Sequence, residues 1–275
     1  MNQKYLLLCI CTFLACMLLS AQQNSTQKKP ITIGESVTFP STILDQERIL
    51  NIYLPESYTK EASGNYPVIY LLDGSMDEDF IHIAGLVQFG SFSWIQMVPE
   101  SIVVGISNID RKHDFTFPTK NKKDKEEFPT TGGSKDFIDF LEKELQPYIN
   151  KNYRTTNTKT IIGQSLGGLL ATEILFKKPQ LFDNYIIVSP SLWWDDESLL
   201  KFAPATFQKK KSIYIAVGKE GPTMERTAKE LYYKLNIEGE KNYTLNFKFL
   251  EAQEHGDALH LAAYGAFEAI FKQQK

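Results

Sequence analysis

The chain has 275 residues, of which 43% are hydrophobic and 23% are charged, a balance typical of a globular protein. This length allows one large domain or two small ones. The formal net charge of −3 provides no basic field, which argues against nucleic acid as a partner.

The first element in the chain is an apolar leader. Residues 5–19 are almost all apolar, follow the single charge of Lys4 and precede the small pair Ser20-Ala21. This pattern is typical of a secretory signal peptide, and the apolar run is shorter than the roughly 20 residues of a membrane span. We therefore predict a signal peptide at 1–21 and one domain at 22–275. The mature chain is expected to be periplasmic or extracellular, without a membrane span.

All three cysteines lie in this leader, at positions 9, 11 and 16. A mature chain without cysteine has neither a disulfide framework nor a cysteine-based metal site. Residues 13–16 partly resemble a lipoprotein signal, but the apolar run continues beyond Cys16, whereas it should precede the cleavage site. Cleavage near Ala21 is therefore favoured over lipid anchoring at Cys16.

The pattern of apolar residues after the leader predicts an α/β fold. Segments 31–39 and 43–54 alternate and are rich in β-branched residues, which favours antiparallel strands at one edge of a sheet. From about residue 66, strand-like and helix-like runs alternate, which predicts a mostly parallel central sheet with helices on both faces. The strand-like runs are 66–74, 101–107, 159–163, 185–189, 212–218 and 243–250, and the helix-like runs are 79–87, 134–149, 166–176, 223–235 and 259–271.

Residues 108–133 form a long segment without hydrophobic periodicity. A segment of this length inside a compact domain is usually functional or disordered. Its charged run at 120–127 is interpreted as a solvated surface.

The stretch Gly163-Gln-Ser165-Leu-Gly167 has the pattern G-x-S-x-G between a strand-like and a helix-like run. This is the context of a nucleophile elbow, a turn so tight that its flanking positions must lack side chains. Ser165 would stand at a helix N-terminus, where N–H groups favour negative charge. The alternative is a glycine-rich turn with Ser165 as helix N-cap, which does not require glycine on both sides.

Two N–H groups are predicted to form the oxyanion hole beside this nucleophile. The first is that of Leu166, directly after the serine, and the second comes from the loop after strand 66–74. Ser75 is the expected donor there, and Asp73 is expected to brace the loop.

The general base is selected from four histidines. In α/β sheets that carry a nucleophile elbow, the serine comes first along the chain, the acid second and the histidine third, and the histidine lies after the final strand. His255 fits this position, and His260 is the alternative. His82 and His113 precede the nucleophile.

Glu220 is the predicted acid, because it directly follows strand 212–218. A carboxylate there would hold the imidazole in the right tautomer. Glu225, Asp195 and Asp196 are alternatives, and so is a Ser-His dyad in which backbone carbonyls orient His255.

Several motifs together resemble the Putative esterase family of α/β-hydrolases, which includes enterobactin-type siderophore esterases, S-formylglutathione hydrolases and feruloyl esterases. The resemblance covers most of the mature chain and rests on residues 70–74, Asn108 with 111–116, 163–168, 189–194 and 254–256. The stretch S-P-S-L-W-W at 189–194 is most similar to the siderophore-esterase branch.

The resemblance implies an α/β-hydrolase fold and roles for further residues. Trp193 and Trp194 would shape the substrate pocket, with ordinary core packing as the alternative. Arg111 would lie at the substrate site, where it and Asp114 would brace the active-site loop.

We therefore predict an exported serine esterase that acts through an acyl-enzyme on Ser165. Its partner would be a small-molecule or glycan ester, of the siderophore or carbohydrate type. No metal and no cofactor are implied. The alternatives are an acyltransferase with the same site and a non-catalytic binding protein on a hydrolase scaffold.

Overall fold

The computed structural model describes residues 27–238 and 242–272. The chain divides into two units, Met1–Thr32 and Ile33–Lys275. In the first unit, residues 27–32 are exposed and lack regular secondary structure. The predicted signal peptide and its cysteines lie outside the described residues, so the leader and the domain boundary at residue 22 stay predictions.

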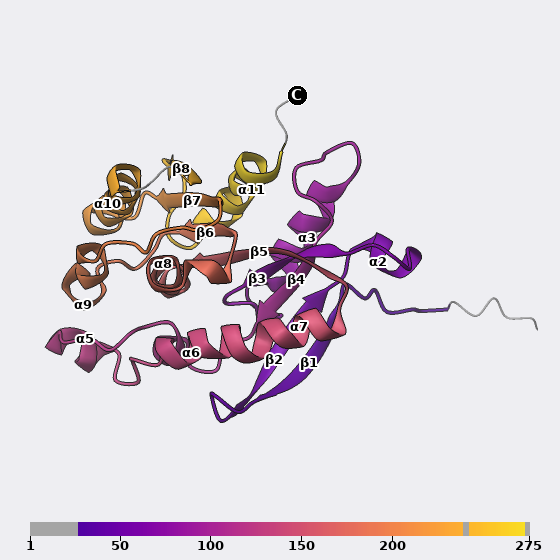
Figure 1. Cartoon of the computed structure of the whole chain (residues 1–275), viewed down its shortest axis with the longest axis horizontal. Helices are drawn as coiled ribbons and strands as arrows, with labels where there is room; N and C mark the ends of the chain where they lie inside the picture. Colours follow the sequence, from indigo (N-terminus) through magenta and orange to yellow (C-terminus); the bar gives the residue numbers. More distant parts are fainter. Residues whose placement is uncertain (1–26, 239–241, 273–275) are drawn as a thin grey trace, which may run out of the picture. The chain divides into compact units, whose positions relative to one another are not determined.

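Eight strands of the second unit form one mixed sheet in the order β1-β2-β4-β3-β5-β6-β7-β8 (Figure 1). β2 pairs antiparallel with both β1 and β4, and every other neighbouring pair is parallel. This arrangement confirms the predicted fold class with its antiparallel N-terminal strands. The strands are Glu35–Ser41 (β1), Gln46–Tyr53 (β2), Tyr66–Leu71 (β3), Ile102–Ile106 (β4), Thr155–Gln164 (β5), Asn184–Val188 (β6), Lys211–Gly218 (β7) and Tyr243–Leu250 (β8).

Helices cover both faces of the sheet, as predicted, and each face has its own hydrophobic core. In β3, Val68 and Tyr70 belong to one core, while Ile69 and Leu71 belong to the other, because successive side chains of a strand point to opposite faces. Helices α3 (Phe80–Ser91) and α11 (Ala258–Phe271) pack on one face. The opposite face is covered by α6 (Ser134–Phe140), a π-helical turn (Leu141–Leu145), α7 (Gln146–Asn152), α8 (Leu166–Lys177) and α10 (Pro222–Glu238).

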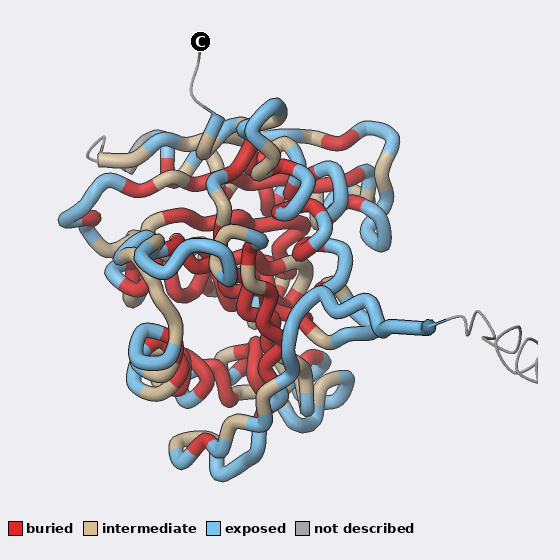
Figure 2. The backbone as a smooth tube through the Cα atoms, turned by 90° about the vertical axis from the view of Figure 1, so that its right-hand side faces the viewer, coloured by how far each residue is buried: buried red, intermediate tan, exposed pale blue. Residues whose placement is uncertain are grey.

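Short helices complete the fold along the outer loops, which Figure 2 shows as exposed segments around a buried centre. They are α2 (Glu56–Lys60), α4 (Arg111–Asp114), α5 (Lys122–Glu127), α9 (Trp194–Glu197) and two 3₁₀ turns, Pro179–Leu181 and Ser198–Lys201.

The segment 108–133 has structure that periodicity did not predict. Asn121 caps α5 by accepting hydrogen bonds from the N–H groups of Lys123 and Asp124. Asp124 is buried and accepts hydrogen bonds from Thr119 Oγ1 at 3.1 Å and Asp195 N at 2.9 Å. The charged run is therefore not only a solvated surface, since one of its carboxylates ties the segment to α9.

A buried ion pair fixes the beginning of this segment to the sheet. Arg48 Nη1 of β2 lies 2.7 Å from Asp114 Oδ2 of α4, and the two side chains are only 1% and 3% exposed. The guanidinium also lies over the ring of Phe137, 5.6 Å from its centroid. Removing one partner of such a pair leaves an uncompensated charge in the core.

We expect Arg48→Met to lower the free energy of unfolding by about 3–5 kcal/mol, because Asp114 would then be buried without its cation. Urea unfolding followed by circular dichroism measures the loss. The double variant Arg48→Met/Asp114→Leu should recover much of it, since it removes both charges. A loss below about 1 kcal/mol in the single variant would contradict this account of the pair.

Candidate active site

The site lies at one edge of the sheet, where several parallel strands end. Loops at the carboxyl ends of β3, β5, β7 and β8 carry Ser75, Ser165, Glu220 and His255 in turn. Ligands of open α/β sheets bind at this edge of the strands. The fold therefore brings together residues that are far apart in the sequence.

Ser165 stands in a strained turn between β5 and α8. Its backbone has φ 60° and ψ −119°, a region that residues with a side chain rarely adopt. A Cβ on Gly163 would overlap the carbonyl oxygen of Gly167, and one on Gly168 would lie 2.9 Å from Val188 O. The Ser165 side chain makes no capping hydrogen bond. Ser165 therefore occupies the N-cap position of α8 without a side-chain cap, and the tightness of the turn, rather than capping, requires the glycines at 163 and 168.

His255 and Glu220 lie in direct contact. His255 Nδ1 is 2.5 Å from Glu220 Oε2. Glu220 is almost completely buried, with a side chain 2% exposed, whereas the His255 side chain is 47% exposed. Glu220 also accepts hydrogen bonds from Ser189 Oγ and, at 2.8 Å, from Gly218 N. A carboxylate held by three donors keeps its position when the imidazole beside it changes charge.

The hydrogen bonds keep Glu220 ionised in spite of its burial. Burial alone would raise the pKa of Glu220, but the hydrogen bonds from His255, Ser189 and Gly218 outweigh it, and the pKa lies below its ordinary value. An ionised acceptor at Nδ1 favours the tautomer that has its proton on this nitrogen. The other nitrogen, Nε2, is then free to accept a proton.

The His255 loop is tied to the elbow by one side chain. Gln164 Nε2 donates to the backbone oxygen of His255 at 2.5 Å. The hydrogen-bond neighbour of Ser165 Oγ is Ser191 Oγ, at 3.4 Å. Among the described residues, no hydrogen bond joins Ser165 Oγ to His255. Such catalytic hydrogen bonds are often long without substrate and tighten when it binds.

The other candidates for the acid have different partners. Glu225 Oε1 accepts a hydrogen bond from Gly221 N at 3.1 Å. Asp195 accepts hydrogen bonds from Thr119 Oγ1 and Lys120 N, and Asp196 accepts one from Asn121 Nδ2. Of the four predicted candidates, Glu220 is the one in contact with His255.

The other histidines are also engaged elsewhere. His260, the alternative base, lies with its Nδ1 2.8 Å from His82 Nε2. His113 Nδ1 lies 3.2 Å from Asp114 Oδ1. His255 therefore stays the predicted base.

The two predicted oxyanion donors differ in their surroundings. Leu166 is the first residue of α8, so its N–H has no acceptor within the helix. Ser75 N–H points to Glu78 Oε2 at a long 3.4 Å, and its neighbour Gly74 N–H donates to Ile106 O at 3.0 Å. A substrate oxyanion would have to replace Glu78 as the acceptor of the Ser75 N–H.

Arg111 braces this loop by its contacts with Asp73. Arg111 Nε and Nη2 donate to the two carboxylate oxygens at 2.8 and 2.9 Å, and Asn108 Nδ2 donates to the same carboxylate at 2.6 Å. Burial would lower the pKa of Arg111, but the hydrogen bonds and charge of Asp73 raise it. The guanidinium is thus occupied by a protein carboxylate, and substrate binding by Arg111 stays a prediction.

The two tryptophans lie in different environments. Trp194 is completely buried in the core, and its Nε1 donates to Phe117 O at 2.9 Å. A side chain without exposed surface contacts no ligand in this conformation, so core packing describes Trp194. Trp193 is partly buried, with its ring 5.9 Å from that of Phe128. A wall of the substrate pocket stays a prediction for Trp193.

The described ranges 27–238 and 242–272 contain no group of three or more His, Cys, Asp or Glu side chains that could hold a metal ion. Within the same ranges, no helix is long and apolar enough to cross a membrane.

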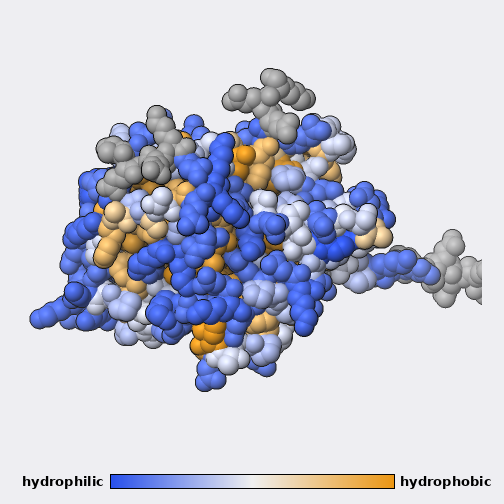
Figure 3. All heavy atoms as spheres, in the orientation of Figure 1, coloured by the Kyte–Doolittle hydropathy of each residue, from blue (hydrophilic) through white to orange (hydrophobic). Residues whose placement is uncertain are grey.

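On the face seen in Figure 3, hydrophilic residues surround small apolar areas.

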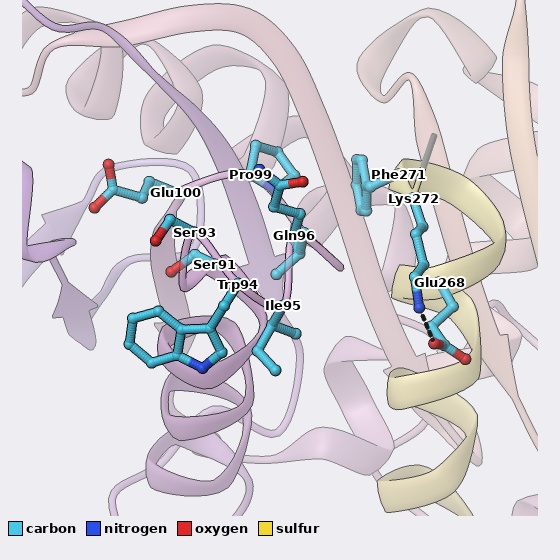
Figure 4. Close-up of a pocket in the computed structure, with 11 residues that line it drawn as sticks. Ser91, Ser93, Trp94, Ile95, Gln96, Pro99, Glu100, Glu268, Phe271 and Lys272 are labelled. Atoms are coloured by element: carbon cyan, nitrogen blue, oxygen red, sulfur yellow. Dashed lines mark hydrogen bonds and ion pairs between the residues drawn. The ribbon is translucent and has the colours of Figure 1, made fainter. Parts of the chain in front are cut away.

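A hollow of about 1040 Å³ lies between residues 91–100 and the end of α11 (Figure 4). It is lined by Trp94, Gln96, Phe271 and neighbouring residues, and it contains none of the predicted catalytic side chains. Residues 91–100 lead into the amino end of β4, whereas Ser165 follows the carboxyl end of β5. This hollow is therefore not the catalytic pocket.

Comparison with known proteins agrees with this geometry. Residues 41–264 match the model of the family described as Putative esterase. The chain is 30% identical over 263 residues to the ferri-bacillibactin esterase BesA of Bacillus subtilis, an alignment that covers 85% of this chain and 91% of that protein.

Solved structures are similar over most of the chain. An IroE-like serine hydrolase from Shewanella oneidensis has a TM-score of 0.77 and 29% identity, over 87% of this chain and 80% of that one. The BES protein from Bacillus cereus has a TM-score of 0.77 and 27% identity, over 92% of this chain and all of that one.

Proposed function

The chain belongs to the Putative esterase family of serine hydrolases, and from this premise we propose that it is an exported esterase that cleaves a siderophore ester through an acyl-enzyme on Ser165. The observation that carries the catalytic part is the 2.5 Å contact between His255 and the buried Glu220, at the same sheet edge as the strained Ser165 turn.

In the proposed reaction, Ser165 Oγ attacks the ester carbonyl while His255 Nε2 accepts the hydroxyl proton. Glu220 stabilises the imidazolium that forms. The N–H groups of Leu166 and Ser75 hold the oxyanion of the tetrahedral intermediate. The ester C–O bond then breaks, and His255 returns the proton to the leaving alcohol. Water, activated by the same histidine, hydrolyses the acyl-enzyme and restores Ser165.

The siderophore part of the proposal is supported by the relatives. The Bacillus subtilis relative is a ferri-bacillibactin esterase and matches nearly end to end. A second relative, a siderophore triacetylfusarinine C esterase from Aspergillus fumigatus, is 39% identical over 82 residues, or 29% of this chain. In such a substrate the iron is cargo, and the ester bond is the reacting group.

A substrate panel tests the proposal. The chain would be incubated with ferri-bacillibactin, ferri-triacetylfusarinine C, a feruloylated glycan and an acetylated glycan, with Ser165→Ala in parallel. With the wild type, but not with Ser165→Ala, mass spectrometry should show siderophore fragments that have gained one water for each ester bond cut. Cleavage of only the glycan esters would contradict the siderophore assignment. Faster acyl transfer to an added alcohol than to water would favour the acyltransferase.

Export is supported by the apolar leader at 1–21. Expression of the full chain in a bacterial host, followed by fractionation and intact-mass measurement, tests this step. A product outside the cytoplasm that begins at Gln22 is expected. A product that keeps residues 1–21, or one that begins at an acylated Cys16, would contradict cleavage near Ala21.

A further inference from the structure

Two exposed histidines form a bridge between the helices that follow two loops of the candidate active site. His82 is the third residue of α3, and His260 is the third residue of α11. Their facing nitrogens, His82 Nε2 and His260 Nδ1, are 2.8 Å apart. The ring centroids are 4.6 Å apart, with planes inclined by 50°. The two histidines are 178 residues apart in the sequence.

The packing beneath the rings holds the pair together. Ile83 and Ala84 of α3 and Ala262 and Ala263 of α11 are buried in one hydrophobic core. The two helices lie side by side on this face of the sheet (Figure 1). The imidazoles therefore meet because the buried faces of two rigid elements fix their spacing.

The separation of the nitrogens matches that of two ligands on one metal ion. Zn–N bonds measure about 2.0–2.1 Å, so two imidazole nitrogens on one Zn²⁺ are about 2.9–3.4 Å apart for angles between 90° and tetrahedral. The two nitrogens are 2.8 Å apart, so they would have to separate by only a few tenths of an ångström to reach this range. We propose that His82 and His260 bind one first-row transition cation, such as Ni²⁺ or Zn²⁺, between Nε2 and Nδ1, with water as the remaining ligands.

The proton balance of this step is simple. In the neutral pair, one facing nitrogen carries the proton of the hydrogen bond, and the other accepts it. On metal binding, the donor ring takes its proton on its other nitrogen, so both facing lone pairs bind the cation and no net proton is released. Burial, and then the charge of His260, lower the pKa of His82, which favours the neutral ligand form.

Two features predict the selectivity and strength of the site. Imidazole ligands favour Cu²⁺, Ni²⁺ and Zn²⁺, whereas Mg²⁺ and Ca²⁺ prefer oxygen. Because only two protein ligands are available, water exchanges freely at the other positions and binding is weaker than at a structural zinc site. Asp79 and Asp257, the N-cap residues of the two helices, stand three residues before the histidines.

The position of the pair gives the bound cation a structural effect. α3 follows the loop that contains Ser75, and α11 follows the loop that contains His255. A cation between their first turns would clamp these two helices to each other. The two histidines are brought together only in the folded chain, so the cation binds the folded state more tightly than the unfolded state. Its binding should therefore raise the midpoint of thermal unfolding.

Thermal unfolding with the metal alone tests the site, using chelator-treated chain without a polyhistidine tag. At a tenfold excess over Kd, Ni²⁺ or Zn²⁺ should raise the midpoint by about 2–4 °C. Ca²⁺ and Mg²⁺ should have no effect. Calorimetric titration should give one Ni²⁺ per chain.

Variants separate this pair from other histidines. His82→Gln and His260→Gln keep a hydrogen-bonding amide at the surface but should each abolish the shift and the titration signal. The matched control is His113→Gln, another partly exposed histidine, which should keep both. A shift that survives in His82→Gln and in His260→Gln, or an equal shift with Ca²⁺, would overturn the proposal. These readouts do not depend on ester hydrolysis, so they stand apart from the proposed activity.

Discussion

Replacing Ser165 with alanine should lower kcat for ester hydrolysis by about 10⁴–10⁶-fold. The variant lacks the Oγ atom that forms the acyl-enzyme, so only the oxyanion hole and substrate binding remain to accelerate the reaction. The free energy of unfolding should change little, because alanine meets the same backbone strain at φ 60° as serine does. Steady-state kinetics with a p-nitrophenyl ester measures the first effect, and urea unfolding measures the second.

Ser191 provides the matched control for this experiment. Its hydroxyl lies 3.4 Å from Ser165 Oγ, in the same part of the site. Ser191 does not lie in the G-x-S-x-G turn, so Ser191→Ala should keep most of the activity. If Ser191→Ala were inactive and Ser165→Ala active, the nucleophile would have been assigned to the wrong serine.

Replacing Glu220 with glutamine should lower kcat by about 10³–10⁴-fold with little change in KM. The amide would be nearly the same size as the carboxylate, so Ser189 and Gly218 would keep an acceptor. The amide NH₂ group, however, would face His255 Nδ1 and favour the tautomer with its proton on Nε2. That tautomer cannot accept the proton of Ser165.

Glu225→Gln is the control for the acid. Glu225 contacts the backbone N–H of Gly221 rather than His255. The kcat of Glu225→Gln should therefore stay within about twofold of the wild-type value, as for a residue outside the reaction. Full activity in Glu220→Gln would favour the Ser-His dyad, and equal losses in the two variants would contradict a specific role of the Glu220–His255 contact. Thermal unfolding of both variants checks that any loss of activity does not come from loss of the fold.

The candidate catalytic residues could be selected from the sequence because they stand in local patterns. The glycines around Ser165 are required by the turn itself, and this turn needs a strand before it and a helix after it. Once the elbow is located, chain order indicates the loops that hold the acid and the histidine. The antiparallel strands β1 and β2 were predictable for the same reason, since their alternation is local.

The choice of Glu220 over Glu225 depends on a contact between distant loops. A Cβ on Gly218 would lie 2.6 Å from Gln253 O and 2.9 Å from Glu220 Oε1. The loop after β7 therefore packs closely against the loop that carries His255, and this packing turns Glu220 toward the imidazole. No pattern within either loop contains that information.

The features that sequence analysis missed depend on other long-range contacts. Trp194 is adjacent to Trp193, and the sequence does not distinguish the two rings. Only the folded chain shows that Trp194 is buried and donates a hydrogen bond to Phe117 O. Arg48 and Asp114 are 66 residues apart, so no local pattern indicates their pairing, and Asp114 was predicted only to brace the active-site loop. The short helix α5 depends on the side-chain cap of Asn121 rather than on an apolar stripe.

The role of Ser165 as nucleophile is tested most simply by mapping the residue that reacts with an active-site probe. The chain would be treated with a fluorophosphonate probe, digested and analysed by tandem mass spectrometry, with His255→Ala in parallel. We expect one adduct, on Ser165, that forms far more slowly in the variant. An adduct on another residue, or ester hydrolysis by a chain that takes no label, would contradict it.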